Sequence, residues 1–336
     1  MIEFKETIIR NLIFHKISNI EKDNYLNSEL FTFTNDEEEM VLKKIFLKPF
    51  LTSATTYEFK HDIDLELNVL YKLSTSIYEE ENFVDISKNI HQHLKSVSKH
   101  PNIKDGELFI VQYSDVKMGN VFYDAVGIYK IENKDSFLEI QSNKLILKKG
   151  ISSRKLDKAC LILFTKKPYT IFVIDNGIIE TDYWKNEFIK AGCKNDNINN
   201  TSQVLSLTKD FITQQLPQQF EVSKADQVDF LNKSVKFFKE KDCFNMDEFA
   251  NEVIVQPEII ESFNQYKSSY QQNFDIDIAD EFLISESAVK KQARAFKSVI
   301  KLDKNFHIYV HGDRHLIEQG EDKKGKFYKV YYQEES

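Results

Sequence analysis

The start of the chain alternates hydrophobic and polar residues in a way that predicts one strand and two helices. The apolar run 8–17 suits a strand. Thr34 or Asn35 then offers a capping side chain, and four acidic residues follow in the first turn, where the helix dipole favours carboxylates. Pro49 ends this helix. A second helix is predicted over 85–99. The apolar positions that set the helical spacing are Met40, Leu42, Ile45 and Phe46 in the first helix, and Ile86, Ile90, Leu94 and Val97 in the second.

The middle of the chain, from about Gly106 to Asp175, changes to short apolar runs separated by polar breaks. The runs read LFIVQY, VFYDAVGIYKI, SFLEI, KLILKK, ACLILF and YTIFVI. They are rich in β-branched and aromatic residues, and they follow one another closely. This pattern predicts a mainly antiparallel sheet built as a meander.

After residue 175 the spacing of apolar residues becomes helical. One stripe, containing Trp184 and Phe188, ends at Gly192, which we expect to act as a C-cap. A second stripe over 204–212 ends before Pro217. Further helices are predicted over 223–240, 245–255 and 285–301, followed by a hairpin over 306–332.

These elements predict an α+β protein with two domains. The segment 215–222, which contains Pro217, is the expected boundary. An α+β domain with an antiparallel sheet would occupy 1–216, and a smaller helical domain with a terminal β-hairpin would occupy 217–336. A chain of 336 residues is long enough for two domains, and its 41% hydrophobic and 29% charged residues are ordinary for a folded protein.

Neither a membrane segment nor a cysteine framework is indicated. No run approaches the ~20 apolar residues of a membrane-spanning helix, and the N-terminus lacks the apolar centre of a signal peptide. A cytoplasmic protein is therefore expected. The cysteines, Cys160, Cys193 and Cys243, are too widely spaced for a Cys-x-x-Cys metal or redox pair. Cys160 lies in an apolar run, where we expect it to pack in the core.

The net charge of −8 is distributed unevenly along the chain. Residues 287–336 contain 11 Lys and Arg against 7 Asp and Glu, a balance of +4. The preceding 286 residues contain 34 against 46, a balance of −12. Proteins that coat phosphates usually carry surplus basic residues, because their binding releases condensed counterions. The C-terminal end is therefore the part suited to nucleic acid.

Several segments resemble one known family in their content and order. They are HQHLKSVSKHPNIKDGELFIVQY from His91, YWKNEFIKAG from Tyr183, TKDF from Thr208, DEFANEV from Asp247, FDIDIADEFLIS from Phe274 and the terminal IKLDKNFHIYVHGDRHLIEQ. In this order they resemble the 37-kilodalton (NdpA-like) nucleoid-associated protein family of bacteria, over essentially the whole chain. The resemblance implies association with nucleoid DNA, either direct or through proteins bound there. It brings no catalytic signature.

The sharpest candidate for DNA contact is the predicted helix 285–301. Its apolar positions, Val289, Ala293, Phe296 and Ile300, are expected to form one seam. Basic residues recur one position later, at Lys290, Arg294, Lys297 and Lys301. Such a stripe suits a phosphate backbone. The alternative interpretation is a solvated helix face that keeps the protein soluble.

The other candidate binding or metal-ligating residues give weaker signals. A basic group at the terminal hairpin comprises Arg314, Lys323, Lys324, Lys326 and Lys329, with Glu321 and Asp322 among them. A third group comprises the run LILKKG at 145–150 with Arg154, Lys155 and Lys158. His311 and His315 are interpreted as turn residues and not as metal ligands, because Gly312 breaks helical geometry. Asp275, Asp277 and Asp280 are interpreted as solvated carboxylates.

Walker A, Gly-x-Gly-x-x-Gly, Gly-x-Ser-x-Gly and His-Glu-x-x-His patterns are absent from the sequence. We therefore expect a non-enzymatic protein with no cofactor and no metal. The predicted function is sequence-tolerant binding to double-stranded DNA through the basic C-terminal region. The alternative, favoured by the net charge of −8, is an interaction protein that docks onto a DNA-handling enzyme with little or no direct DNA contact. The acidic runs 36–39 and 79–81 are either solvated faces or a surface that repels DNA and instead engages a basic protein.

Overall fold

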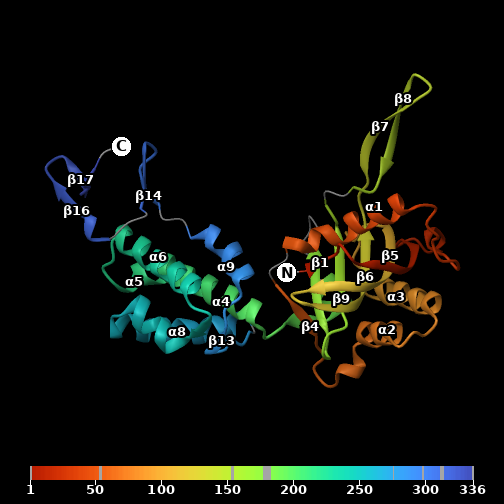
Figure 1. Ribbon diagram of the computed structural model, residues 1–336, viewed down its shortest axis with the longest axis horizontal. Coiled ribbons are helices and arrows are strands. Elements are labelled where there is room, and N and C mark those ends of the chain that lie inside the picture. Colours follow the sequence, from red (N-terminus) through yellow and green to blue (C-terminus); the bar gives the residue numbers. More distant parts are fainter. Residues whose placement is uncertain are drawn as a thin grey trace. The chain divides into compact units, whose positions relative to one another are not determined.

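The chain forms two compact units, Met1–Lys194 and Asn195–Ser336. The computed structural model (Figure 1) describes residues 2–52, 55–152, 155–176, 183–274, 276–296, 299–310 and 314–334. Helices combine with a large antiparallel sheet and a terminal hairpin, so the predicted α+β class is confirmed. The division between the units precedes the boundary expected at 216/217. The reason is that the apolar residues of 204–216 pack into the core of the second unit.

A single antiparallel sheet organises the N-terminal unit. Among the described residues, nine strands take the order β11-β4-β10-β9-β6-β5-β2-β3, with β1 beside β5. Their bounds are β1 Ile2–Glu3, β2 Ile8–Ile17, β3 Tyr25–Leu26, β4 Tyr57–Phe59, β5 Gly106–Met118, β6 Val121–Ile131, β9 Lys158–Leu163, β10 Thr170–Asp175 and β11 Ala191–Cys193. The strands β5, β6, β9 and β10 lie side by side in the sheet in the same order in which they occur in the chain, as the predicted meander requires.

Both faces of this sheet are covered, which explains why its central strands are apolar throughout. Helices α2 (Val69–Tyr78) and α3 (Phe83–Val97) pack on one face, together with the π-helical turn Tyr183–Ile189. Helix α1 (Asp36–Leu47) packs on the other (Figure 1). Every residue of β9 is buried, including Cys160, whose predicted place in the core is confirmed.

Local capping chemistry fixes the helix starts of this unit. The Asn35 side chain accepts a hydrogen bond from the Glu38 amide over 3.0 Å, so α1 begins where its acidic first turn predicts. The predicted C-cap at Gly192 is wrong. Lys190 takes the left-handed conformation, with φ 53°, and Gly192 lies in β11 opposite Glu58. Ala191, directly after Lys190, therefore already pairs with Phe59 of β4.

The hairpin formed by β7 (Asp135–Gln141) and β8 (Lys144–Gly150) departs from the predicted meander. Its two strands pair only with each other among the described strands, and it connects the sheet neighbours β6 and β9. Figure 1 shows it projecting away from the sheet of the N-terminal unit.

The C-terminal unit is helical around an aromatic core. Its helices are α4 Asn197–Asp210, α5 Leu216–Gln219, α6 Lys224–Glu240, α7 Met246–Phe249, α8 Pro257–Phe274 and α9 Glu286–Gln292, with π-helical turns at Phe211–Gln215 and Ala250–Ile254. The strands β12 (Cys243–Asn245) and β13 (Glu281–Leu283) pair beside them. The Phe244 ring stacks between Phe238 and Phe282, with ring centroids 5.2 and 4.8 Å away.

The described residues after α9 include two hairpins. Strand β14 (Val299–Leu302) pairs with β15 (Phe306–Tyr309), and β16 (Ile317–Asp322) pairs with β17 (Gly325–Val330). The predicted continuous helix over 285–301 is therefore wrong beyond Gln292. The apolar positions Val289, Phe296 and Ile300 are buried as expected, but a helix, a turn and a strand carry them.

Candidate nucleic-acid interface

The predicted basic stripe does not lie on one helix. Lys290 is on α9, Arg294 lies in the 3-10 turn Ala293–Ala295, and Lys301 is on β14 opposite His307. All three side chains are exposed. Lys297 lies outside the described residues. The stripe is therefore a set of separate cations at the surface, and Lys290 already pairs with Glu286 over 3.2 Å.

The terminal hairpin presents its lysines as predicted. Lys323 and Lys324 form the turn between β16 and β17, and Lys326 follows on β17. All three are exposed. Glu321 faces Lys326 across the strand pair, and the Asp322 carboxylate accepts from the Lys324 amide over 2.7 Å. The carboxylates at this tip therefore reduce its positive potential without removing it.

Arg314 does not share this exposure. Its Nε lies 2.6 Å from Asp226 Oδ1, and its remaining donors reach the Ile317 carbonyl and Ser223 Oγ. Ser223 and Asp226 form the capping box of α6. Burial opposes ionisation of the carboxyl, but hydrogen bonds from Ser223 and Arg314 outweigh it and hold the pKa of Asp226 below its usual value. Arg314 joins the terminal segment to α6 and leaves the set of candidate DNA contacts.

The third basic group is also changed by the tertiary structure. Lys158 is buried in β9 and pairs with Asp175 over 2.5 Å, so it is not part of a surface patch. Arg154 lies outside the described residues, as do Asp275 and His311. Asp277 accepts from the Asn195 side chain over 3.2 Å, and Asp280 pairs with Lys267. Among the described residues, no three His, Cys, Asp or Glu side chains gather as metal ligands.

Charge is separated most strongly inside the C-terminal unit. Residues 1–194 contain 27 Lys and Arg and 29 Asp and Glu, a balance of −2. Residues 195–286 contain 7 against 17, a balance of −10, whereas 287–336 carry +4. The N-terminal unit is therefore close to neutral, and most of the acidic surplus of the first 286 residues lies in 195–286. The acidic and basic parts of the protein belong mainly to the same unit.

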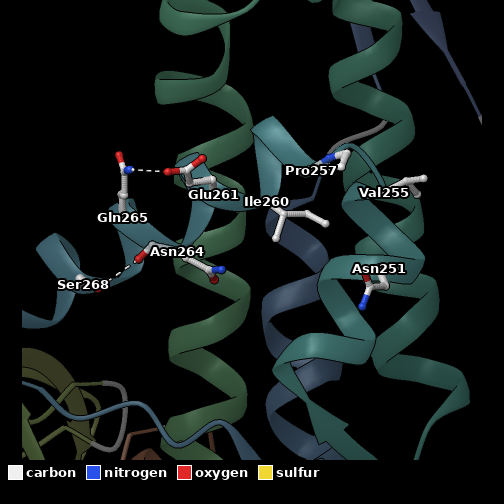
Figure 2. A pocket seen from close by; sticks show the side chains of 8 residues that line it. All are labelled: Asn251, Val255, Pro257, Ile260, Glu261, Asn264, Gln265 and Ser268. Carbon is white, nitrogen blue, oxygen red and sulfur yellow. Dashed lines mark hydrogen bonds between the residues drawn. The ribbon is translucent and has the colours of Figure 1, made fainter.

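A surface groove on the C-terminal unit has a volume of about 580 Å³ (Figure 2). Its lining residues are Asn251, Val255, Pro257, Ile260, Glu261, Asn264, Gln265 and Ser268. Gln265 donates to Glu261 over 3.5 Å, and Ser268 Oγ donates to the Asn264 carbonyl. These eight residues carry one carboxylate and no cation, so the groove is unsuited to phosphate.

Sequence patterns missed a buried polar cluster in the N-terminal unit. Lys130 is 1% exposed and donates to the Lys104 carbonyl (2.6 Å), Glu132 Oε1 (2.9 Å) and Tyr183 OH (3.2 Å). Burial lowers the pKa of Lys130 and raises that of Tyr183. Since three donors meet three acceptors, the cluster is a satisfied structural network. Only the single Lys inside an apolar strand, in GIYKI, signals it in the sequence.

Over residues 13–334 the chain matches the family model described as nucleoid-associated protein YejK. The chain belongs to that family. A comparison with curated proteins finds no match. Among the described residues, no helix is long and apolar enough to cross a membrane.

Proposed function

We propose that this protein binds double-stranded DNA directly, without catalysis and with little dependence on sequence, through its basic C-terminal surface. The proposed contacts are Lys290, Arg294, Lys297, Lys301, Lys323, Lys324 and Lys326. Membership of a nucleoid-associated family supports this proposal. The observation that carries direct contact is the group of exposed lysines at the tip of the β16–β17 hairpin.

The chemistry of these residues accounts for the proposed lack of sequence preference. Lysine is a flexible point charge, and it contacts phosphate oxygens without reading base edges. A hairpin tip that carries three lysines brings several charges to a phosphate backbone together. Each neutralised phosphate releases counterions, so the free energy of binding depends on salt more than on bases.

The charge separation within the C-terminal unit also supports the proposal. A balance of −10 over 195–286 repels phosphate, whereas +4 over 287–336 attracts it. A protein with net charge −8 therefore approaches DNA with its terminal hairpins first. This orientation reconciles the acidic total with binding to a polyanion.

The test is fluorescence anisotropy with labelled duplexes of unrelated sequence, titrated in salt from low to physiological concentration. We expect similar affinities for every duplex, and a logarithm of affinity that falls linearly with the logarithm of salt concentration. One duplex bound far more tightly than the rest, at a salt-independent affinity, would contradict backbone binding.

The second candidate function is docking onto a DNA-handling enzyme with little direct DNA contact. The net charge of −8 favours it, because a surplus of carboxylates suits a basic protein surface. The same titration separates the two functions. An absence of binding to every duplex at low salt would support the docking protein, and capture from a lysate on immobilised protein would then identify the enzyme.

A further inference from the structure

A strained and exposed valine precedes helix α8. Val255 has φ 68° and ψ −45°, and the Gln256 amide donates to the Ile254 carbonyl over 2.8 Å. This is a γ-turn with a positive φ at its centre, a conformation that is rare and strained, and a β-branched residue at positive φ is itself unusual. The Val255 side chain is nevertheless 59% exposed. Strained residues cluster at ligand-binding positions, so Val255 is a candidate contact.

Val255 lines the groove of about 580 Å³ described above (Figure 2), and a second depression continues that groove. The second depression has a volume of about 370 Å³ and shares Asn264 and Ser268 with the first. Both lie along α8, from Pro257 to Gln271, and we name them together the α8 groove. At ~1.5 Å per helical residue, this length is about 20 Å. An extended peptide of about six residues spans such a length.

The two depressions differ in chemistry. The first contains three apolar side chains, those of Val255, Pro257 and Ile260. The α8 groove as a whole contains four exposed carboxylates, those of Asp247, Glu261, Asp280 and Glu281. Among the residues that line it, Lys267 is the one cation, and it pairs with Asp280. The groove therefore combines an apolar end with a negatively charged end.

The surrounding chain strengthens this negative charge. Residues 247–266 contain five Asp and Glu and no Lys, Arg or His. Glu248 and Glu252 pair with Lys241, which leaves Asp247, Glu258 and Glu261 to attract cations. Over the described parts of the chain, no three His, Cys, Asp or Glu side chains lie close enough to hold one metal ion. The separated carboxylates suit a partner whose positive charges are also separated.

Amide side chains in the groove match the backbone of a peptide. Asn251 and Asn264 are exposed, and their side-chain amides bond to none of the residues drawn in Figure 2. A primary amide both donates and accepts hydrogen bonds, as each peptide group does. These two side chains can therefore hold an extended peptide that lies along α8.

We propose that the α8 groove binds a basic peptide segment of another protein. An apolar side chain of the segment packs against Val255 and Ile260, and its Lys or Arg side chains lie beside the groove carboxylates. DNA is a poorer occupant because the carboxylates repel phosphate. A second copy of this chain is also poorer, because a two-fold axis would bring the same carboxylates together. The inference rests on the second candidate function, docking onto a protein, and names its site.

The first experiment selects from a phage-displayed library of random heptapeptides on the immobilised full chain. We expect the enriched sequences to combine an apolar residue with more than one Lys or Arg. The most enriched peptide is then synthesised with a fluorescent label, and its affinity for the full chain is measured by anisotropy. Enrichment no greater than on a blank surface would overturn the proposal, as would enrichment of sequences that lack Lys and Arg.

The charged end of the groove is tested by the double variant Asp247→Asn, Glu261→Gln. Loss of two of the four carboxylates should weaken binding of the labelled peptide by about tenfold. The matched control is Glu66→Gln, Glu81→Gln, which changes the net charge equally at exposed positions of the N-terminal unit and should bind the peptide like the wild type. Equal peptide affinity of the two double variants would overturn the proposal. Their affinities for duplex DNA should be equal, so peptide docking and DNA binding can fail separately.

The apolar end is tested by Val255→Gly. Glycine adopts a positive φ without strain, so the variant should unfold at a higher temperature than the wild type, measured by circular dichroism. It should also bind the labelled peptide about fivefold more weakly, because the apolar contact is lost. A variant that had merely lost its fold would not become more stable. Wild-type peptide affinity in Val255→Gly would overturn the proposed contact.

Discussion

The guanidinium of Arg314 and the carboxylate of Asp226 meet at 2.6 Å, although 88 residues separate them in the chain. Asp226 also receives hydrogen bonds from the amide and hydroxyl of Ser223, at 2.9 and 2.6 Å. A single carboxylate therefore caps α6 and fixes the start of the segment that leads into β16. The terminal hairpin and its lysines are held on the C-terminal unit through this pair.

We predict that Arg314→Met destabilises the C-terminal unit and has a smaller effect on DNA affinity. Loss of the partly buried ion pair should lower the free energy of unfolding by about 1–3 kcal/mol, measured by urea denaturation. Lys324→Met, at an exposed turn, is the matched control and should change stability by less than ~0.5 kcal/mol. An Arg314→Met variant with wild-type stability and strongly reduced DNA affinity would return Arg314 to the binding surface.

Reversing the charge of Lys323, Lys324 and Lys326 to Glu should weaken DNA binding uniformly across duplex sequences. Each lysine that neutralises a phosphate contributes about one unit to the salt slope, so the triple variant should lose up to ~3 units. The control is reversal of Lys233, Lys236 and Lys239, which are exposed on α6, where Asp229 and Glu240 pair with two of them. An equal loss of affinity in both triple variants would mean that net charge alone, and not the hairpin tip, controls binding.

His15 should make the protein sensitive to mild acid. The ring is fully buried, Nδ1 accepts from the Asn27 amide (3.2 Å), and Nε2 therefore carries the proton that it donates to Ser87 Oγ (2.9 Å). Burial, followed by the nearby His91 and Lys88, lowers the pKa of His15 to about 4. The unfolded chain binds a proton near pH 6.5, so stability is full above that pH and is lost as pH falls toward 4.

The contribution of His15 to this loss is about 3 kcal/mol between pH 7.5 and pH 4. Urea unfolding at several pH values should show it in the wild type. The variant His15→Gln should be less stable at pH 7.5 but lose less of its stability on acidification. His100→Gln, at an exposed position, should follow the wild-type profile. A wild-type free energy of unfolding that is constant between pH 7.5 and pH 4 would contradict this account of His15.

Replacing Lys130 should be strongly destabilising because it leaves the carboxylate of Glu132 buried without its partner. The Glu132 side chain is only 9% exposed. We expect Lys130→Met to cost about 3–5 kcal/mol, measured by thermal and urea denaturation. The double variant Lys130→Met, Glu132→Gln should recover much of this loss, since no uncompensated charge remains. A double variant as unstable as Lys130→Met would show that packing of the lysine stem matters more than its charge.

The sequence by itself determined the local elements and their order. Helix α1 begins directly after Asn35 and α6 directly after Ser223, because these capping side chains accept hydrogen bonds from amides three residues away. The antiparallel sheet followed from alternating apolar runs, and the likeness to nucleoid-associated proteins followed from the order of segments. These features depend on residues close together in the chain, so the sequence alone is sufficient to predict them.

Only the tertiary structure decided which residues are exposed. The predicted helix does not continue to residue 301, because β14 pairs with β15 instead. This pairing satisfies the backbone hydrogen bonds of β14 while Ile300 stays buried. Lys158 pairs with Asp175, and Arg314 pairs with Asp226. These two cations are therefore engaged within the fold and do not add to the predicted basic surface. The β7–β8 hairpin lies outside the large sheet because β6 pairs directly with β9. Each outcome depends on contacts between distant residues, which spacing along the chain does not encode.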